Sequence, residues 1–129
     1  MLSQQTKYAL RALIYLKNQP AEQFVKVEQI AQDADLPAAY LSKILKQLTN
    51  GKLLLSRRGT NGGVQFDRRN RQVTFHAICE AVDDPIVREE CVLFKKACNK
   101  NMPCPFHKTW SKSKEQLLAF LKATSIEKM

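Results

Sequence analysis

Residues 27–50 read VEQIAQDADLPAAYLSKILKQLTN, and this stretch decides the fold of the chain. Apolar residues recur at helical spacing in two runs, which Leu36-Pro37 separates. The first run predicts a helix over residues 27–34, and the second predicts a helix over residues 37–50. The residues expected to face the core are Val27, Ile30, Ala31, Ala34, Leu41, Ile44, Leu45 and Leu48. Two short helices joined by a tight turn predict a helix-turn-helix motif.

The following residues extend this motif with a β-hairpin. Pro37 suits the first position of the second helix, and Gly51 suits the C′ position after it. A strand is predicted over residues 52–56, a tight basic turn over 57–63 and a return strand over 64–66. The turn contains Asn-Gly and Gly-Gly, which favour hairpins because such turns need positive φ. A helix-turn-helix followed by a basic hairpin predicts a winged helix.

Further helices are predicted on both sides of the motif. The apolar pattern predicts one over residues 4–18, and Thr74 can N-cap another over residues 75–83. The apolar residues of a last helix, over about 107–124, are Trp110, Leu117, Leu118 and Leu121. This stripe is more than a helix needs to pack on a loop. We interpret it as a dimer contact, with packing inside its own domain as the alternative.

The expected fold class is therefore mainly α, a winged helix-turn-helix with a small β-hairpin wing and a long C-terminal dimerisation helix. Residues 1–72 are expected to form the DNA-binding domain. Residues 73–129 would add a linker helix, a cysteine loop over 84–106 and the dimerisation helix.

The net charge of +9 lies mostly in the N-terminal part of the chain. Residues 1–72 hold 12 Lys and Arg against 5 Asp and Glu, whereas residues 73–129 hold 9 against 7. A basic half of this kind suits a polyanionic partner. No apolar run approaches the roughly 18 residues of a membrane span. Lys7 and Arg11 stand where a signal peptide needs its apolar stretch, so a cytoplasmic location is expected.

Cys91, Cys98, Cys104 and His107 follow one another with the spacing Cys-x6-Cys-x5-Cys-x2-His. Thiolates select iron–sulfur clusters, zinc or Cu(I), and imidazole suits iron and zinc. Cytosolic thiols stay reduced, so this cluster favours metal binding or redox sensing over disulfides. The loop lacks the short cysteine knuckles of zinc ribbons. We therefore predict metal ligation, with an iron–sulfur cluster ahead of zinc, whereas Cys79 is expected in the core.

Three stretches of the chain resemble the Rrf-two (Rrf2) family of winged-helix iron–sulfur transcriptional regulators. They are Lys7-Tyr8-Ala9-Leu10-Arg11, the wing Arg58-Gly59-Thr60-Asn61-Gly62-Gly63 and the three-cysteine loop. The resemblance covers nearly the whole chain. It implies a homodimer that binds a pseudo-palindromic operator in double-stranded DNA, as a repressor or an activator.

The same resemblance implies that Cys91, Cys98 and Cys104 bind the cluster. In IscR-like members a histidine completes a [2Fe–2S] cluster, and His107 occupies that place. In some NsrR-like members an acidic residue of the partner's first helix completes a [4Fe–4S] cluster. The matching residue here is Lys7, which cannot serve. The first gap is one residue longer than in IscR, which leaves the cluster type open, and the intact cysteine triad argues against the cluster-free CymR-like branch.

The residues expected to contact DNA are Ala38, Tyr40, Ser42, Lys43, Lys52, Arg57 and Arg58. The first four lie in the N-terminal half of the predicted recognition helix, which would enter the major groove. Ser42 stands where IscR has a base-reading glutamate, so base preference cannot be transferred. Arg58 is expected in the minor groove or at phosphates, and Arg57 and Lys52 at phosphates.

The expected function is a DNA-binding regulator whose affinity for DNA the cluster switches in response to nitric oxide, redox state or iron and cluster supply. Two alternatives are a winged helix that zinc stabilises and a regulator that senses oxidation through thiols alone. An enzyme is not expected, because the chain has no Cys-x-x-Cys motif, no phosphate-binding loop and no recognisable acid pair.

Overall fold

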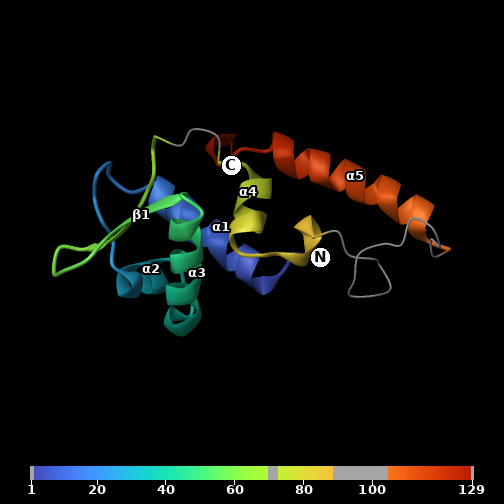
Figure 1. Cartoon of the computed structure of the whole chain (residues 1–129). Helices are drawn as coiled ribbons and strands as arrows, with labels where there is room; N and C mark the ends of the chain where they lie inside the picture. Colours follow the sequence, from blue (N-terminus) through green and yellow to red (C-terminus); the bar gives the residue numbers. More distant parts are fainter. Residues whose placement is uncertain (1, 70–72, 89–104, 129) are drawn as a thin grey trace.

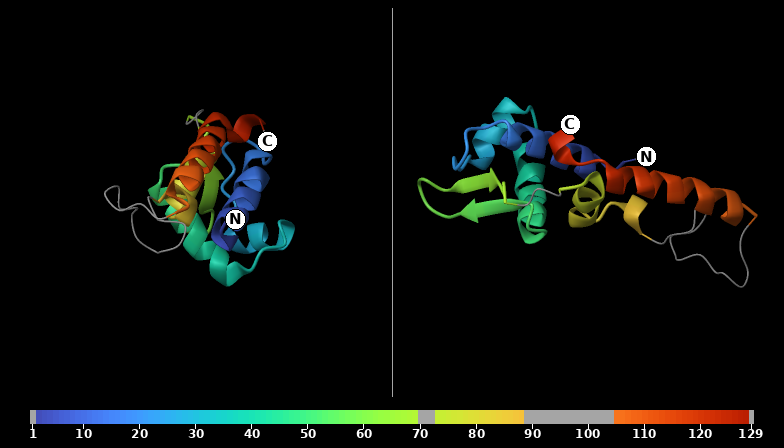
Figure 2. Two further views of the ribbon diagram at one scale, coloured as in Figure 1. Left: turned by 90° about the vertical axis from the view of Figure 1, so that its right-hand side faces the viewer. Right: turned by 90° about the horizontal axis from the view of Figure 1, so that it is seen from above.

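The computed structural model describes residues 2–69, 73–88 and 105–128. Its elements are α1 (Gln4–Lys17), α2 (Val27–Asp33), α3 (Ala38–Asn50), β1 (Leu54–Arg57), β2 (Gly63–Phe66), α4 (Phe75–Ala81), η1 (Pro85–Val87), α5 (His107–Ala123) and η2 (Ile126–Lys128) (Figure 1). The predicted class, a mainly α winged helix-turn-helix with a long C-terminal helix, is confirmed. Helix α5 extends from the body of the molecule as an arm (Figure 1 and Figure 2).

Helices α1, α2 and α3 surround a hydrophobic core. The apolar stripe predicted for the second helix of the motif is buried throughout, with Leu41, Ile44, Leu45 and Leu48 at most 2% exposed. From α1 and α2 the core receives Ala9, Ala12, Leu13, Leu16 and Ile30. The same core continues past the wing and includes Val73, Ile78, Val82 and Ile126. Both halves of the chain are therefore packed on shared apolar residues.

Helices α2, α3 and α4 are each followed by a non-glycine residue in the left-handed region. These residues are Asp35 (φ 53°), Lys52 (φ 64°) and Asp83 (φ 57°). The next backbone N–H donates to a carbonyl of the last helical turn, as in a Schellman motif. The donor and acceptor pairs are Leu36 to Ala31, Leu53 to Leu48, and Asp84 to Cys79, at 2.9–3.0 Å. The backbone thus reverses sharply after each helix without glycine at the left-handed position.

The prediction that Gly51 is the C′ residue is wrong. Gly51 is the C-cap of α3 with a φ of −79°, and the left-handed residue is Lys52. Glycine suits position 51 for another reason, because a Cβ there would lie 3.0 Å from the Cβ of Ala81 in α4. The missing side chain therefore allows α3 and α4 to approach closely.

The wing is a two-stranded antiparallel hairpin in which Leu54 pairs with Phe66 and Arg57 with Gly63. The first strand begins two residues later than predicted, because residues 52 and 53 complete the turn after α3. The second strand begins one residue earlier than predicted. Both strands bury the side chains that face the core, including Leu54, Val64 and Phe66.

Residues just before α2 tie the hairpin to the helix-turn-helix. Val25 forms an isolated antiparallel bridge with Val64, through backbone hydrogen bonds of 2.8 and 2.9 Å. Gly63 has a φ of 140°, and a Cβ there would lie 2.3 Å from the carbonyl oxygen of Val25. Glycine is thus required at position 63 both by its conformation and by the close approach of the neighbouring backbone.

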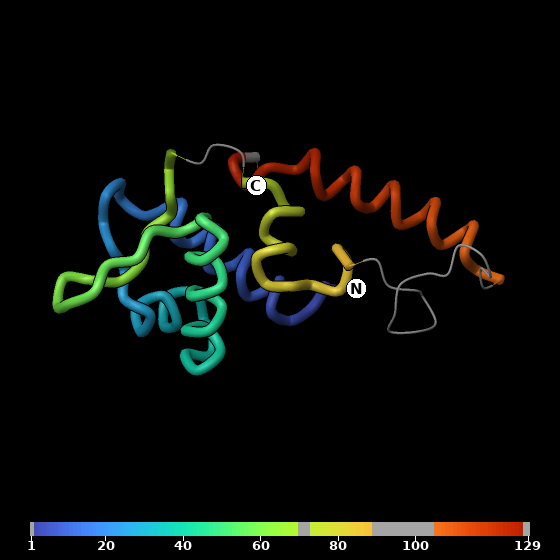
Figure 3. The backbone as a smooth tube through the Cα atoms, in the orientation of Figure 1, coloured from blue at the N-terminus to red at the C-terminus, as the bar shows by residue number. Residues whose placement is uncertain are grey.

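Helix α4 begins at the predicted N-cap, where the hydroxyl of Thr74 accepts a hydrogen bond of 3.0 Å from the N–H of Ala77. Helix α5 has 17 residues, of which Leu121 alone is buried in the described structure. The ring of Phe120 lies 6.4 Å from that of Phe75, yet Phe120 is 56% exposed. The start of α5 and the tip of the wing lie at opposite ends of the molecule (Figure 3). Within the described residues, no helix has the length and apolar character needed to cross a bilayer.

Candidate nucleic-acid interface and metal centre

The exposed face of α3 carries the four residues predicted for it, Ala38, Tyr40, Ser42 and Lys43. Tyr40 is 56% exposed, and its ring meets that of Tyr8 edge to face at 6.3 Å between centroids. The outward position of these residues follows from helical geometry, since the buried stripe occupies the opposite face. The N-terminal half of α3 therefore presents polar side chains to solvent.

A hollow of about 220 Å³ lies between α3 and the wing. Its lining includes Ser42, Lys46 and Asn50 of α3 and Ser56 of β1. The hollow thus joins one predicted DNA-contacting residue, Ser42, to the first strand of the wing. The sequence-based site did not include Lys46, although its spacing of three and four residues from Lys43 and Ser42 places it on the same helix face.

The wing arginines are exposed, and Arg57 has a defined partner. Its guanidinium carbon lies 4.1 Å from the centroid of the Phe24 ring, a cation–π stack. Arg58 is exposed beside it. Lys52 is also exposed but follows the last residue of α3, so the helix separates it from Ala38 by roughly 20 Å. Lys52 therefore lies away from the other predicted contacts on α3.

Helix α1 supports the helix-turn-helix from behind. Arg11 donates from one terminal nitrogen to the carbonyls of Ala34 and Asp35, at 2.5 and 3.1 Å. The Tyr15 hydroxyl donates to Asp33 at 2.5 Å, and this hydrogen bond raises the pKa of Tyr15 to about 12. Both contacts hold the C-terminal end of α2. Arg11 supplies a donor to carbonyls that the helix leaves unpaired, and Tyr15 binds a side chain of the last turn.

The predicted ligands Cys91, Cys98 and Cys104 lie outside the described residues. His107 is the first residue of α5 and is half-buried. Its Nδ1 is buried and makes no hydrogen bond in the described structure, and the same holds for Nε1 of Trp110 one turn later. Among the described residues, no group of three or more His, Cys, Asp and Glu side chains gathers at one place.

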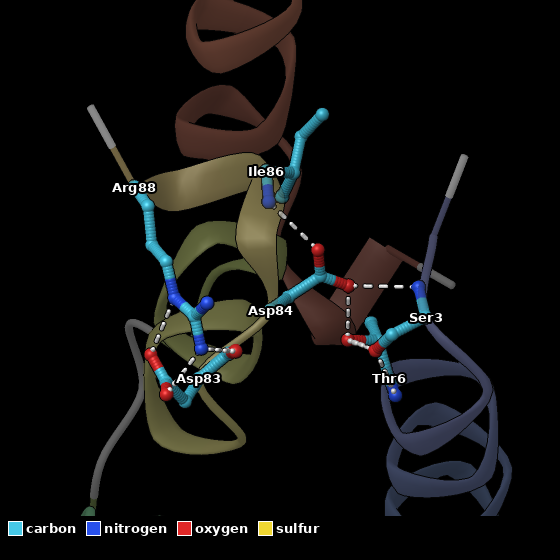
Figure 4. A network of polar contacts seen from close by, with 6 residues as sticks. All are labelled: Ser3, Thr6, Asp83, Asp84, Ile86 and Arg88. Atoms are coloured by element: carbon cyan, nitrogen blue, oxygen red, sulfur yellow. Dashed lines mark hydrogen bonds and ion pairs between the residues drawn. The ribbon is translucent and has the colours of Figure 1, made fainter. Parts of the chain in front are cut away.

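A buried carboxylate, that of Asp84, lies at the start of the predicted cysteine loop (Figure 4). Asp84 is 1% exposed, and its Oδ2 accepts hydrogen bonds from the hydroxyl of Thr6 at 2.6 Å and the N–H of Ser3 at 3.0 Å. Its Oδ1 accepts from the N–H of Ile86 at 2.8 Å. Burial alone would raise the pKa of Asp84, but the hydrogen bonds outweigh it and hold the pKa below its ordinary value. Asp84 thus joins the segment after α4 to the first turn of α1.

The described start of the predicted cysteine loop has two further contacts. Arg88 forms an ion pair with Asp83 at 2.5 Å (Figure 4). Lys114 of α5 donates to the carbonyl of Arg88. Arg88, the last described residue before Cys91, is therefore in contact with α5, whose first residue is a predicted ligand.

Cys79 is fully buried, as predicted for a core residue. Burial, followed by the charge of Asp84, raises the pKa of this thiol to about 11. Cys79 therefore stays protonated and unreactive near neutral pH. It is a suitable matched control for substitutions of the other three cysteines.

A helix-turn-helix with a basic wing and an exposed polar face on its second helix defines the winged-helix class of DNA-binding proteins. The profile of the Rrf2 family, described as "Iron-dependent Transcriptional regulator", matches residues 2–129, and the chain belongs to this family. The family consists of transcriptional regulators and not of enzymes.

The chain is similar to individual members of the family. An HTH-type transcriptional regulator of Aquifex aeolicus is 31% identical over 129 residues, which cover 98% of this chain and 89% of that protein. The regulator NsrR of Halalkalibacterium halodurans is 28% identical over 90 residues, 70% of this chain and 62% of its own length.

Two solved structures share the fold. CymR, the global cysteine regulator of B. subtilis, superposes with a TM-score of 0.77 at 21% identity, covering 98% of this chain and 93% of that one. IscR of T. potens has a TM-score of 0.72 at 20% identity, with coverage of 98% and 83%.

Proposed function

We propose that the chain is a homodimeric DNA-binding transcriptional regulator whose affinity for DNA depends on an iron–sulfur cluster bound by Cys91, Cys98, Cys104 and His107. The observation that carries the proposal is this donor set, three thiols and an imidazole within residues 91–107 of a member of an iron-dependent family. A regulator of this kind acts where the DNA is, in the cytoplasm. Nitric oxide, redox state and iron or cluster supply are the candidate signals.

The environment of His107 fits a ligand role. Among the described residues, the buried Nδ1 of His107 has no hydrogen-bond partner. An unpaired buried nitrogen is costly, and a metal would supply a partner. Thiolates with imidazole form a donor set that iron–sulfur centres use. When bound, a cluster of this kind supplies a redox-active centre.

The exposed face of α3 and the wing support the DNA-binding part of the proposal. In helix-turn-helix dimers two recognition helices enter major grooves about one DNA turn, roughly 34 Å, apart. A pseudo-palindromic operator follows from that symmetry. The half-buried residues of the α5 stripe, Trp110, Leu117 and Leu118, are the proposed dimer contact, because a 17-residue helix with one residue buried in its own chain gains little stability by itself.

The described contacts suggest how the two ends of the molecule communicate. Asp84 binds the first turn of α1, and α1 supports α2 and α3 through Arg11 and Tyr8. A change in the cysteine loop would reach the recognition helix along this path. A coupling free energy of about 1–3 kcal/mol would change DNA affinity by roughly 5- to 150-fold.

The test begins with anaerobic purification, a visible spectrum, and iron, sulfide and zinc assays. The proposal predicts a coloured protein with about two or four irons per chain, as the two cluster types require. Its DNA affinity should differ between the loaded and empty forms, measured on DNA fragments selected from a random pool. A colourless protein with one zinc, or one without metal after reconstitution, would contradict the cluster and favour the zinc or thiol alternative.

Matched variants separate cluster binding from folding. Cys98→Ala should abolish cluster loading and make DNA affinity independent of reconstitution, whereas Cys79→Ala should retain both properties. The switch is refuted if Cys98→Ala still responds to reconstitution as the unmodified protein does.

A further inference from the structure

We propose that Phe24 is a positioning residue for DNA binding, because its ring holds the guanidinium of Arg57 with the N–H edge free to contact a DNA phosphate. The inference rests on the DNA-binding function proposed above and adds a residue from the connection between α1 and α2. That connection lies outside the predicted recognition helix and wing.

The stack leaves the hydrogen-bonding groups of Arg57 accessible. Its guanidinium carbon is 4.1 Å from the centroid of Phe24, which is half-buried, whereas Arg57 is exposed. Within the described part of the chain, the side chain of Arg57 donates no hydrogen bond and pairs with no carboxylate. Stacking covers the flat face of a guanidinium, and its donors lie at the edge. A planar fork with a free edge suits bidentate phosphate binding.

Contacts of the two residues after Phe24 fix the position of its ring relative to the wing. The next residue, Val25, makes two backbone hydrogen bonds to Val64, at 2.8 and 2.9 Å. The residue after it, Lys26, donates from Nζ to the carbonyl of Gly59 at 3.4 Å. Residues 24–26 therefore contact the wing at three successive points. This short segment pairs with β2 through one isolated bridge, which fixes where the ring meets the arginine.

Holding Arg57 in place before DNA arrives should increase affinity. An exposed arginine loses side-chain freedom when it binds a phosphate, and a preformed stack removes part of this loss. The ordering of one long side chain costs roughly two- to tenfold in affinity, and saving part of this cost corresponds to about two- to fivefold for each chain. The effect is independent of base sequence, because the contact is to the backbone.

The experiment measures anisotropy of a labelled duplex of about 30 base pairs, long enough for two half-sites. Full-length variants are compared in one cofactor state and over a range of salt concentrations. Phe24→Ala should weaken binding about two- to fivefold per chain with an unchanged salt dependence. Arg57→Ala should weaken binding and reduce the slope of log affinity against log salt by about 0.9 for each phosphate that the variant no longer binds.

Conservative and double variants test whether Phe24 changes DNA affinity through Arg57. Phe24→Tyr keeps a ring and should bind as the unmodified protein does. Arg57→Lys keeps the charge without the flat face, and should reproduce the loss of affinity of Phe24→Ala without any change to the core. Phe24→Ala added to Arg57→Ala should cause no further loss of affinity, because the partner is already absent.

Three results would overturn the inference. Additive effects in the double variant would mean that Phe24 acts on the fold. An unchanged affinity and salt slope for Arg57→Ala would mean that Arg57 does not contact DNA. If Phe24→Ala does not fold, Arg57→Lys replaces it in the test. DNA affinity of Arg57→Lys equal to that of the unmodified protein would show that the stack does not contribute to DNA binding. Absence of binding by the unmodified protein, loaded or empty, would instead contradict the proposed function.

Discussion

Lys52 occupies a backbone conformation that glycine adopts at lower cost. Its φ of 64° lies in the left-handed region, where the Cβ of an L-residue crowds the backbone. The turn after α3 nevertheless needs this conformation, because it brings Leu53 back to bond Leu48 and enter the wing. The conformation of this one residue therefore allows the chain to turn from α3 into the wing.

Replacing Lys52 with glycine should stabilise the protein. Lys52→Gly removes the left-handed strain, and we expect the free energy of unfolding to rise by about 1 kcal/mol. Lys52→Ala is the control, because alanine retains the Cβ and should not show this gain. Urea denaturation of the three proteins measures the difference, and equal effects of glycine and alanine would exclude backbone strain as the cause.

Asp84 should contribute stability that depends on pH. Asp84→Asn replaces one carboxylate oxygen with an NH2 group that faces hydrogen-bond donors, so we expect a loss of about 1–3 kcal/mol at pH 7. The pKa of Asp84 is lowered in the folded protein from an ordinary 3.8. Its ionised form therefore stabilises the fold above that value, and this contribution is lost as pH falls through the folded pKa.

The comparison that tests Asp84 is the urea midpoint of both proteins from neutral to acidic pH. The difference between them should be constant above the ordinary pKa and should narrow in acid. A difference that stays constant into acid would show that the carboxylate charge is not responsible. The exposed residues Asp33 and Asp83 are present in both proteins, so their effect on stability cancels in the difference between the two urea midpoints.

At the scale of elements, hydrophobic spacing predicted α1 and α3 well because each of them buries one face in the core. The predicted span 27–34 compares with Val27–Asp33 in the structure, and the predicted Thr74 cap is present. The ends of helices were harder to predict, since the residue with left-handed conformation after α3 is Lys52 and not Gly51. Contacts between distant segments, such as Asp84 with Thr6 or Phe24 with Arg57, left no local pattern to detect. The residues of the candidate DNA face could therefore be predicted, whereas the long-range contacts that hold this face in place could not.

The wing should depend on the absence of a side chain at position 63. Gly63→Ala places a Cβ 2.3 Å from the carbonyl oxygen of Val25, at a φ that alanine rarely adopts. Such crowding typically costs about 1–3 kcal/mol, and the wing should separate from the segment before α2. Hydrogen exchange of the Val25 and Val64 amides, which bond each other's carbonyls, measures the separation.

Gly59→Ala provides the matched control at the wing tip. Gly59 also has positive φ, at 107°, but a Cβ there would meet no atom within 4 Å. Gly59→Ala should therefore cause backbone strain without a clash, and hydrogen exchange of the Val25 and Val64 amides should stay slow. Equally fast exchange in both variants would attribute the effect of Gly63→Ala to strain alone.

At the scale of the whole molecule, α5 has apolar side chains that its own chain does not bury. Its exposed Phe120 and half-buried Leu117 and Leu118 lie on an arm that extends from the body (Figure 1). The proposed dimer would bury these side chains. The division of the chain at residue 72 stays a prediction, while the shared core shows that residues beyond it pack with the helix-turn-helix.

A charge on the arm should dissociate the dimer. Burying a phenylalanine contributes about 1.5–3 kcal/mol, so Phe120→Glu should weaken self-association about tenfold or more. Ala119→Glu introduces the same charge at the adjacent exposed position and is the control. Sedimentation equilibrium measures both. A variant that stays dimeric but melts earlier would assign Phe120 to its contact with Phe75 inside one chain.

The bridge between Val25 and Val64 has a practical consequence for transplanting the DNA-reading unit into another regulator. A donor fragment cut at residue 27, where α2 begins, would contain the entire helix-turn-helix and wing. It would nevertheless leave behind the residues that pair with β2, stack on Arg57 and cap the wing turn. Chimeras should therefore be joined upstream of Phe24, and a junction three residues later would transfer the recognition helix without its wing in register.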